Sequence, residues 1–332
     1  MDNIISKEEF AKIYQEKFEP VAKELEPVRL ENIEKKKSFS IKYLIFSIIF
    51  IAVAVGVFLS MSIRFDLFFF VVLFLAIIYF CTIHSINEKE RKILKKSLVS
   101  KILSVFGNIY FSESKDIIPL LQIKKMGLFS RATTKTDDDT IIGMYKGCNF
   151  VINECKMTHT EGSGKNSTTV TDFDGIIVKI QMHKKFTSQT IVGVDNHIRK
   201  LRGFEDVQLE SVEFMKNRKV YSTDQIEARY ILTTSFIERL EQLGKVFNCN
   251  FNSQYSSSPF ASKIVDFLGI VAVSAAFVDG YAYLFVPNSK DFFEINTRKT
   301  LLNPDQYYGI YVELSSILNI VEYMKFDQKL GL

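Results

Sequence analysis

The stretch that decides how this chain is organised is YLIFSIIFIAVAVGVFLSMSI at residues 43–63, followed by RFD at 64–66 and LFFFVVLFLAIIYFCTIHSI at 67–86. The first run has no Asp, Glu, His, Lys or Arg over 21 positions, and the second has only His84, near its end. A helix of this length spans roughly 30 Å, the thickness of a bilayer's hydrocarbon core. Because only three residues connect the two runs, the helices must be antiparallel. The sequence therefore predicts a two-helix transmembrane hairpin, 43–63 and 67–86.

Basic residues flank this hairpin on both sides, whereas its tip carries one Arg and one Asp. Cationic flanks remain on the cytoplasmic side of a membrane, so both termini are expected there. The same collar could contact anionic lipid headgroups. The basic collar consists of Lys35, Lys36, Lys37, Lys42, Lys89, Arg91, Lys92, Lys95 and Lys96.

The overall composition excludes several classes of protein. The chain has 332 residues, is 47% hydrophobic and 24% charged, and carries a formal charge of +4. Those values exclude a disordered chain, a collagen-like repeat and a disulfide-rich mini-protein. The charge surplus lies in residues 30–101 and is absent from 102–332, so we expect no nucleic-acid partner. The four cysteines form no CxxC pair, and we expect a reducing compartment, no metal and no cofactor.

The rest of the chain divides into helical and strand-like regions. Residues 1–42 are predicted to form a cytoplasmic helical segment. Residues 87–108 are predicted to form a juxtamembrane amphipathic helix, which either lies on lipid headgroups or continues the second span. From 109 the pattern changes to short apolar runs separated by turn signals, so 109–332 is predicted to be a cytoplasmic α+β domain.

Two tight hairpins are predicted within that domain, at Lys146-Gly147 and at Asp279-Gly280, where each dipeptide separates two strand-like runs. The expected fold is a mainly antiparallel sheet with an inserted helix pair and a C-terminal helix that starts after Asn303. It is compatible with a pleckstrin-homology-like barrel, by analogy of fold alone. The acidic run 137–139 is predicted to be a solvated loop, because three adjacent carboxylates rarely converge on a cation.

One segment, STDQIEARYILTTSFIERL at 222–240, is unusually rich in polar side chains. Ser222 and Gln225 match a capping box at the start of a helix. A ligand or partner surface is one interpretation of the polar cluster, and a capped helix held by polar contacts to the sheet is the favoured alternative. The candidate interaction surface consists of Asp224, Gln225, Glu227, Arg229 and Tyr230.

The same segment carries a resemblance to a known family. Together with the N-terminal double span and FDGIIV at 173–178, followed by Lys184 and Thr190, it resembles the bacterial family called domain of unknown function 3137. The resemblance implies a bacterial inner-membrane protein with a cytoplasmic domain. It assigns no catalytic residue.

These observations predict an integral membrane protein whose cytoplasmic domain binds a protein or a lipid headgroup. Two alternatives remain open. One is a membrane-tethered enzyme with a site between the sheet and the helix pair. The other is a transporter in which hairpins oligomerise around a path, and it is the least attractive because the spans lack internal charges. We single out no catalytic residue, because no motif in the sequence supports one.

Overall fold

The computed structural model describes residues 6–61, 65–112, 114, 116–195, 197–216, 218–246, 273–287, 293 and 295–324. These residues form two compact units. The helical unit takes in those between Ile5 and Ile102 and between Phe293 and Tyr311. The sheet unit takes in those between Leu103 and Phe292 and those from Val312 onward. Each unit is described by itself.

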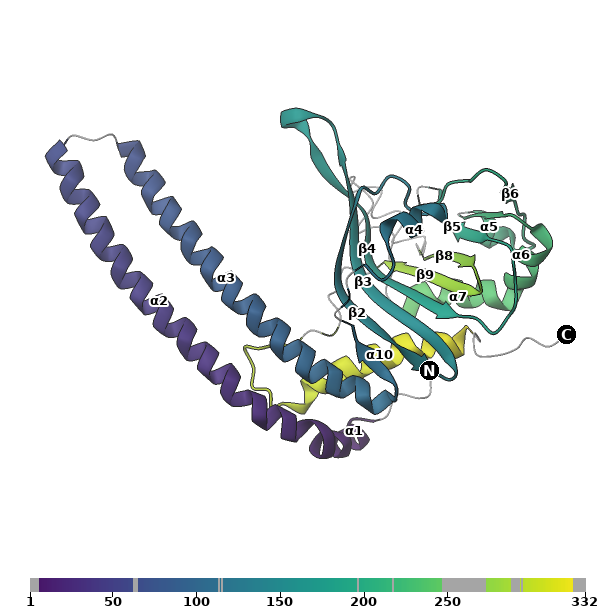
Figure 1. Ribbon diagram of the computed structural model, residues 1–332, viewed down its shortest axis with the longest axis horizontal. Coiled ribbons are helices and arrows are strands. Elements are labelled where there is room, and N and C mark those ends of the chain that lie inside the picture. The colour runs from purple at the N-terminus through teal and green to yellow at the C-terminus, as the bar shows by residue number, and fades with distance from the viewer. Residues whose placement is uncertain are drawn as a thin grey trace. The chain divides into compact units, whose positions relative to one another are not determined.

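Two long helices dominate the helical unit (Figure 1). Its elements are α1 (Lys7–Ile13), the π-helix η1 (Tyr14–Phe18), α2 (Glu19–Met61), α3 (Phe65–Leu103) and the start of α10 (Pro304–Tyr323). α2 and α3 run antiparallel side by side, because Ser40 Oγ lies 3.1 Å from the hydroxyl of Tyr79 and the Tyr43 hydroxyl donates to the backbone oxygen of Leu75. The predicted pair of antiparallel helices is therefore present, and residues 87–103 continue the second helix of the pair.

We find no helix, within the residues that the structure describes, that combines the length and the hydrophobicity a bilayer crossing requires. The transmembrane character predicted for 43–63 and 67–86 is therefore not confirmed. The side chains of 54–69 lie outside the described residues.

Aromatic side chains hold the N-terminal helices against the first turns of α10. Tyr14 packs on Tyr307 with ring centroids 5.2 Å apart, and Phe18 stacks on the same ring at 5.9 Å. Phe10 contacts Tyr308 at 5.4 Å. Phe10, Tyr14 and Phe18 are at most 5% exposed, so this aromatic cluster is the core of this part of the helical unit.

The sheet unit is built on nine antiparallel strands in the order β1-β2-β3-β4-β9-β8-β5-β7-β6. The strands are β1 (Ile109–Phe111), β2 (Thr134–Tyr145), β3 (Cys148–Glu161), β4 (Thr168–Gln181), β5 (Thr190–Gly193), β6 (Glu205–Asp206), β7 (Lys219–Ser222), β8 (Ser274–Val278) and β9 (Tyr281–Pro287). The helices of this unit are η2 (Ser104–Phe106), α4 (Leu120–Lys125), η3 (Gly164–Asn166), α5 (Val212–Lys216), α6 (Gln225–Ile231), α7 (Thr234–Val246) and the remainder of α10. The predicted α+β class and the antiparallel sheet are confirmed. The sheet of the described residues is open, with β1 and β6 at its ends, and does not form the barrel considered above.

Both predicted hairpins are present, and their turns have the backbone geometry that their sequences favour. Lys146 and Gly147 have φ of 48° and 76°, and Asp279 and Gly280 have φ of 53° and 77°. Two successive residues with positive φ are typical of the turn type whose twist matches that of paired strands. The turns therefore fix the registers of β2 with β3 and of β8 with β9.

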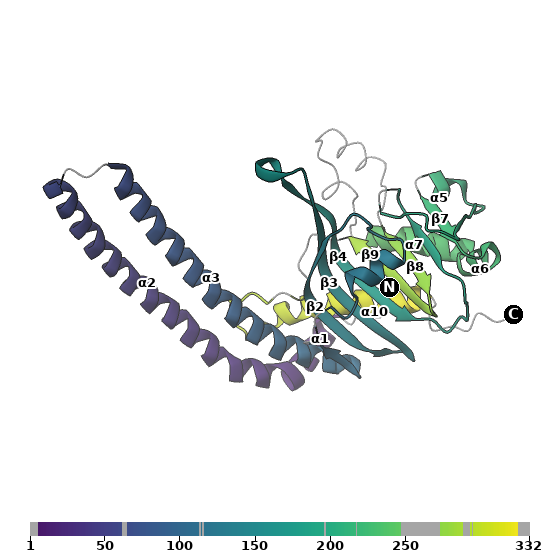
Figure 2. The ribbon, with the colours of Figure 1, turned by 45° about the horizontal axis from the view of Figure 1, so that its top comes forward.

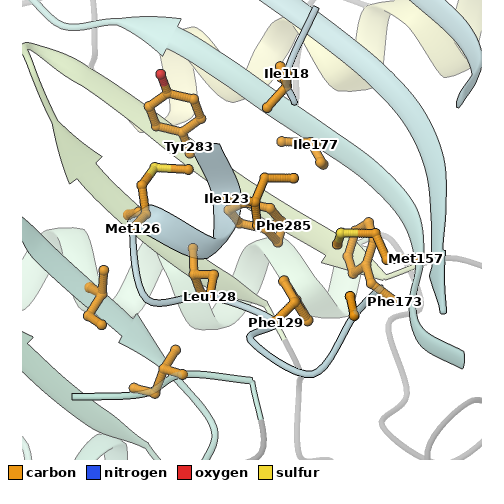
Figure 3. Close-up of a cluster of buried hydrophobic side chains, with 14 of the residues drawn as sticks. Ile118, Ile123, Met126, Leu128, Phe129, Met157, Phe173, Ile177, Tyr283 and Phe285 are labelled. Carbon is orange, nitrogen blue, oxygen red and sulfur yellow. The ribbon is translucent and has the colours of Figure 1, made fainter. Parts of the chain in front are cut away.

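The main core lies on one face of the sheet (Figure 3). Phe129 is at its centre, with its ring centroid 5.2 Å from that of Phe173 and 5.3 Å from that of Phe285. Ile123 of α4 is fully buried against the same cluster. On the other face of the sheet, Phe236 of α7 packs edge-on against Phe277 of β8 at 5.6 Å, since the neighbouring Ala276 and Val278 belong to the main core.

The acidic run 137–139 lies within β2, so the expectation of a solvated loop is wrong. Asp137 forms a buried ion pair with Lys135 and accepts a hydrogen bond from the backbone nitrogen of Asp116 at 2.9 Å. Asp139 is only 5% exposed. The cause is tertiary, because β2 pairs with β3 well beyond the apolar residues that marked it as a strand.

Candidate functional site: the polar surface of helix α6

The segment predicted to carry an interaction surface begins at the end of β7 and continues into α6. Asp224 is the N-cap of α6, and its Oδ1 accepts hydrogen bonds from the backbone nitrogens of Ile226 at 2.7 Å and Glu227 at 3.0 Å. Ser222, predicted as the cap, instead lies in β7, and its hydroxyl binds the backbone nitrogen of Asp224 at 3.1 Å. The start of the helix is thus two residues later than predicted, and a carboxylate serves it well because the N-terminus carries partial positive charge.

Glu227 fastens the loop between β4 and β5 to α6. Its Oε2 accepts hydrogen bonds from the backbone nitrogens of Ser188 at 2.7 Å and Thr187 at 2.9 Å. The hydrogen bonds from Ser188, and then those from Thr187, hold the pKa of the Glu227 carboxyl below its ordinary value. A partner that binds carboxylates would therefore find the Glu227 carboxylate already bound by backbone amides of the chain itself.

Gln225 and Arg229 connect α6 to the end of the sheet. The Gln225 side-chain nitrogen donates to Glu205 of β6 at 2.7 Å. Arg229 donates to the backbone oxygens of Gln208 at 3.3 Å and Gln225 at 3.1 Å. Both side chains serve contacts within the sheet unit.

Tyr230 covers a buried lysine. The Lys184 ammonium lies 3.4 Å from the centroid of the Tyr230 ring and donates to the backbone oxygen of the same residue. Lys184 is only 5% exposed, and its burial lowers its pKa from 10.5 to about 8. Sequence reasoning did not include Lys184 in the site. Its sequence context gave no signal for that contact, because the two residues are 46 positions apart.

The exposed side chains of α6 are Ile226, Arg229 and Tyr230. Ile226 is 80% exposed and Tyr230 is 43% exposed, and the two lie one helical turn apart. Of the five predicted residues, Gln225, Glu227, Arg229 and Tyr230 lie on α6, and Asp224 is its N-cap. Most of their polar atoms bind other parts of the sheet unit, which is the arrangement of a capped helix held by polar contacts. The described residues contain no group of three His, Cys, Asp or Glu side chains placed to hold a metal ion.

The basic collar is distributed over the two long helices. Lys35, Lys36, Lys37 and Lys42 lie on α2, and Lys89, Arg91, Lys92, Lys95 and Lys96 lie on α3. Lys35 pairs with Glu31 at 2.6 Å one turn away, and Lys37, Lys42 and Lys96 are exposed. The side chains of 89–92 and 95 lie outside the described residues.

Comparison with known proteins bears on the sheet unit. Residues 171–267 and 257–326 match the family described as "Protein of unknown function (DUF3137)". The resemblance to this family is confirmed. The DUF3137 match includes FDGIIV at 173–178 and the whole of 222–240, whereas the α2–α3 pair lies before it.

Two further comparisons add little. No curated protein matches the chain. A solved structure titled "crystal structure of the mycobacterial trehalose monomycolate transport factor A, TtfA" is similar at 10% identity, over 69% of this chain and 96% of that one, with a TM-score of 0.31. A similarity of this size establishes neither a shared fold nor a shared function.

Proposed function

We propose that this DUF3137-related chain is a bacterial inner-membrane protein, anchored by α2 and α3, whose sheet unit is a binding module. The observation that carries the proposal is the row of large apolar side chains, 39–71% exposed, on the two helices. Soluble surfaces rarely expose contiguous apolar patches of more than a few hundred Å². The exposed side chains are Ile41, Leu44, Ile45, Phe46, Ile48, Ile49, Phe50, Val53, Phe70, Leu73, Phe74, Ile77, Ile78 and Phe80.

The sequence and the aromatic contacts support the same proposal. Residues 43–63 and 67–86 are each long enough to cross a bilayer as helices. Tyr43 and Tyr79 contact one another at the start of the first run and near the end of the second, with ring centroids 5.1 Å apart. Tyrosines are enriched at that depth, where the ring meets acyl chains and the hydroxyl meets headgroups. The basic collar on the same side favours cytoplasmic termini and contact with anionic lipid.

For the sheet unit, α6 offers a surface suited to a protein partner. Ile226 and Tyr230 are exposed beside Arg229, and tyrosine and arginine are the residue types that most often dominate protein interfaces. An enzymatic role would require an accessible reactive group. Lys184, whose pKa is lowered to about 8, is closed off beneath Tyr230 and is 5% exposed.

Membrane anchoring can be tested by flotation with liposomes, followed by extraction at alkaline pH. We expect the full chain to float and to resist extraction. The double variant Ile48→Lys/Phe74→Lys should lose both properties, because it places two charges among lipid-facing side chains. The matched control is Leu121→Lys/Val212→Lys, which changes two apolar residues of the sheet unit that are at least as exposed and should behave as the parent chain.

Two results would overturn the proposal. Release of the parent chain by alkali would remove the membrane anchor. Equal loss of flotation in both double variants would mean that lysine substitution, and not its place on α2 and α3, disturbs the protein. Orientation is tested separately with a C-terminal reporter fusion, for which activity only in the periplasm would contradict cytoplasmic termini.

A further inference from the structure

The far ends of β3 and β4 form a two-stranded arm that leaves the sheet (Figures 1 and 2). β2 accompanies β3 only as far as the pair Thr134–Thr158, and β9 accompanies β4 only from Gly175 onward. The arm therefore consists of 158–161 paired with 168–171 and the turn between them. At that turn, Gly162 has φ of 84°, and a Cβ there would lie 2.5 Å from the backbone oxygen of Asn166. The tight tip gives the arm a defined shape.

One edge of β4 has no strand beside it within the described residues. β4 pairs with β3 from Thr168 to Ile180, with a β-bulge at Asp172, and its second edge is unpaired over Thr168–Phe173. β9 stops opposite Gly175 at Pro287, which has no N–H to continue the ladder. Alternate residues of this six-residue stretch therefore present backbone donors and acceptors that no strand of the described residues binds.

This edge has few of the features by which proteins usually prevent strand pairing, and its β-bulge at Asp172 lies near one end. Thr168–Phe173 contains no proline and no lysine, and four of its six residues are Thr or Val, which favour strands. Its one acidic side chain, Asp172, is bound by His159 of β3, with Oδ2 2.8 Å from Nδ1. An approaching strand would thus meet little uncompensated charge.

We propose that this edge is a dimer contact, in which β4 pairs antiparallel with β4 of a second copy of the chain. An isologous contact requires a surface that is complementary to itself, and an antiparallel pair of identical strands meets that requirement. A register centred on Val170 sets Thr169 opposite Thr171 and Thr168 opposite Asp172, so no two carboxylates face each other. Cross-strand threonine pairs already occur in this sheet, with Thr134 Oγ1 2.7 Å from Thr158 Oγ1.

The small size of the edge limits how strongly two copies can pair. Six residues per copy are far fewer than the roughly 20–30 residues a side of a standard interface. The pairing is therefore weak at low concentration, and confinement of both copies to one membrane strengthens it by raising their effective concentration. The strengthening by a membrane rests on the proposed function, in which α2 and α3 anchor the chain. The unpaired edge of β4 is present whether or not the chain is anchored.

Disulfide cross-linking of the full chain in vesicles tests the contact. Val170→Cys should yield a covalent dimer, because directly opposite residues of antiparallel strands lie within disulfide range. The matched control is Thr160→Cys, on β3 of the same arm and opposite Thr169 within one copy. The parent chain, with its exposed Cys81, gives the background.

A second pair of variants tests the edge without relying on disulfide geometry. Introduced into the Val170→Cys chain, Thr169→Lys should reduce dimer formation by about tenfold, because it places an ammonium group on the pairing edge of each copy. Thr160→Lys should leave it unchanged. Both positions are exposed, so both variants should fold alike by circular dichroism.

Equal cross-linking by Val170→Cys and Thr160→Cys would overturn the proposal, as would no effect of Thr169→Lys. In native membranes, a cross-link from Val170→Cys to a different protein alone would overturn the choice of a second copy. If the chain does not insert into vesicles, the same variants at raised concentration in solution still test the edge. Failure of anchoring and failure of pairing are thereby separated.

Discussion

A buried carboxylate of the helical unit supports the sharpest stability prediction. Glu26 of α2 accepts hydrogen bonds from Arg29 Nε at 2.9 Å and Nη2 at 2.6 Å. It also accepts one from Thr300 Oγ1 at 3.0 Å and one from the backbone nitrogen of Leu301 at 2.8 Å. Arg29 in turn donates to the backbone oxygen of Thr297 at 3.3 Å. We call these five residues the Glu26 clasp, which ties the segment before α10 to α2.

The perturbation is Glu26→Ala, and its cost follows from burial. The side chains of Arg29 and Glu26 are only 7% and 13% exposed. Removing the carboxylate takes away the counter-charge that binds this buried guanidinium through two hydrogen bonds, and breaking a buried pair typically costs about 3–5 kcal/mol. Glu19 provides a matched control on the same helix, since in its ion pair with Lys23 the two side chains are 32% and 64% exposed. Such i,i+4 pairs contribute only about 0.3–0.5 kcal/mol.

Amide hydrogen exchange of 297–301 measures how far the substitution destabilises the segment before α10. Chemical unfolding of the full chain in detergent measures the change in the free energy of unfolding. We expect Glu26→Ala to lose protection and stability, whereas Glu19→Ala should match the parent. The pKa of Glu26 is lowered, first by its hydrogen bond with Arg29. Its stabilisation is therefore present above the unfolded carboxyl pKa of about 4.3 and is lost as pH falls through the folded pKa. If the two variants differ by less than about 1 kcal/mol at neutral pH, the Glu26 clasp is no stronger than a surface pair.

Two further predictions concern single groups. His159 of the arm has its pKa raised, first by its hydrogen bond with Asp172. The stabilisation by His159 should therefore be complete below about pH 6.5 and lost as pH rises through the folded pKa. After correction for intrinsic exchange rates, the amides of the arm should exchange faster above the folded pKa than below pH 6.5. His159→Gln should abolish the dependence, and an unchanged profile would contradict the role of His159. Tyr14→Phe should be neutral or stabilising because the buried Tyr14 hydroxyl has no hydrogen-bond partner among the described residues. Tyr307→Phe should cost about 1 kcal/mol, because its hydroxyl donates to a backbone oxygen at 2.7 Å; equal melting temperatures for the two variants would refute this difference.

The features that could be predicted from the sequence are those that a few neighbouring residues determine. Lys146-Gly147 and Asp279-Gly280 adopt positive φ in turns closed by their own flanking strands, so a dipeptide and two apolar runs were sufficient. The start of α10 is equally local, because Asn303 Oδ1 accepts from the backbone nitrogen of Asp305 at 3.0 Å.

The errors arose where a distant segment decides the outcome. The acidic run 137–139 resembles a solvated loop in composition, yet Lys135 and the partner strand β3 hold it within the sheet. Ser222 fits a capping box by spacing, but its hydroxyl also lies 2.8 Å from Thr190 Oγ1 on the neighbouring strand β5. Asp224 therefore takes the capping role. Strand pairing is non-local, and no local pattern in these segments encodes it.

Sequence alone says more about the apolar residues of α2 and α3 as candidate membrane spans than about the polar residues of α6 as a candidate binding surface. A lipid environment acts on every side chain of a span, so a local run of apolar residues is enough to suggest it. A binding surface depends on which groups remain after the fold has used the others. Glu227 looks available in sequence, but its carboxylate is occupied by the amides of Thr187 and Ser188, some 40 positions away. A partner of this helix would therefore meet Ile226, Arg229 and Tyr230 first. The other polar residues of the segment mainly explain why the helix is held in place.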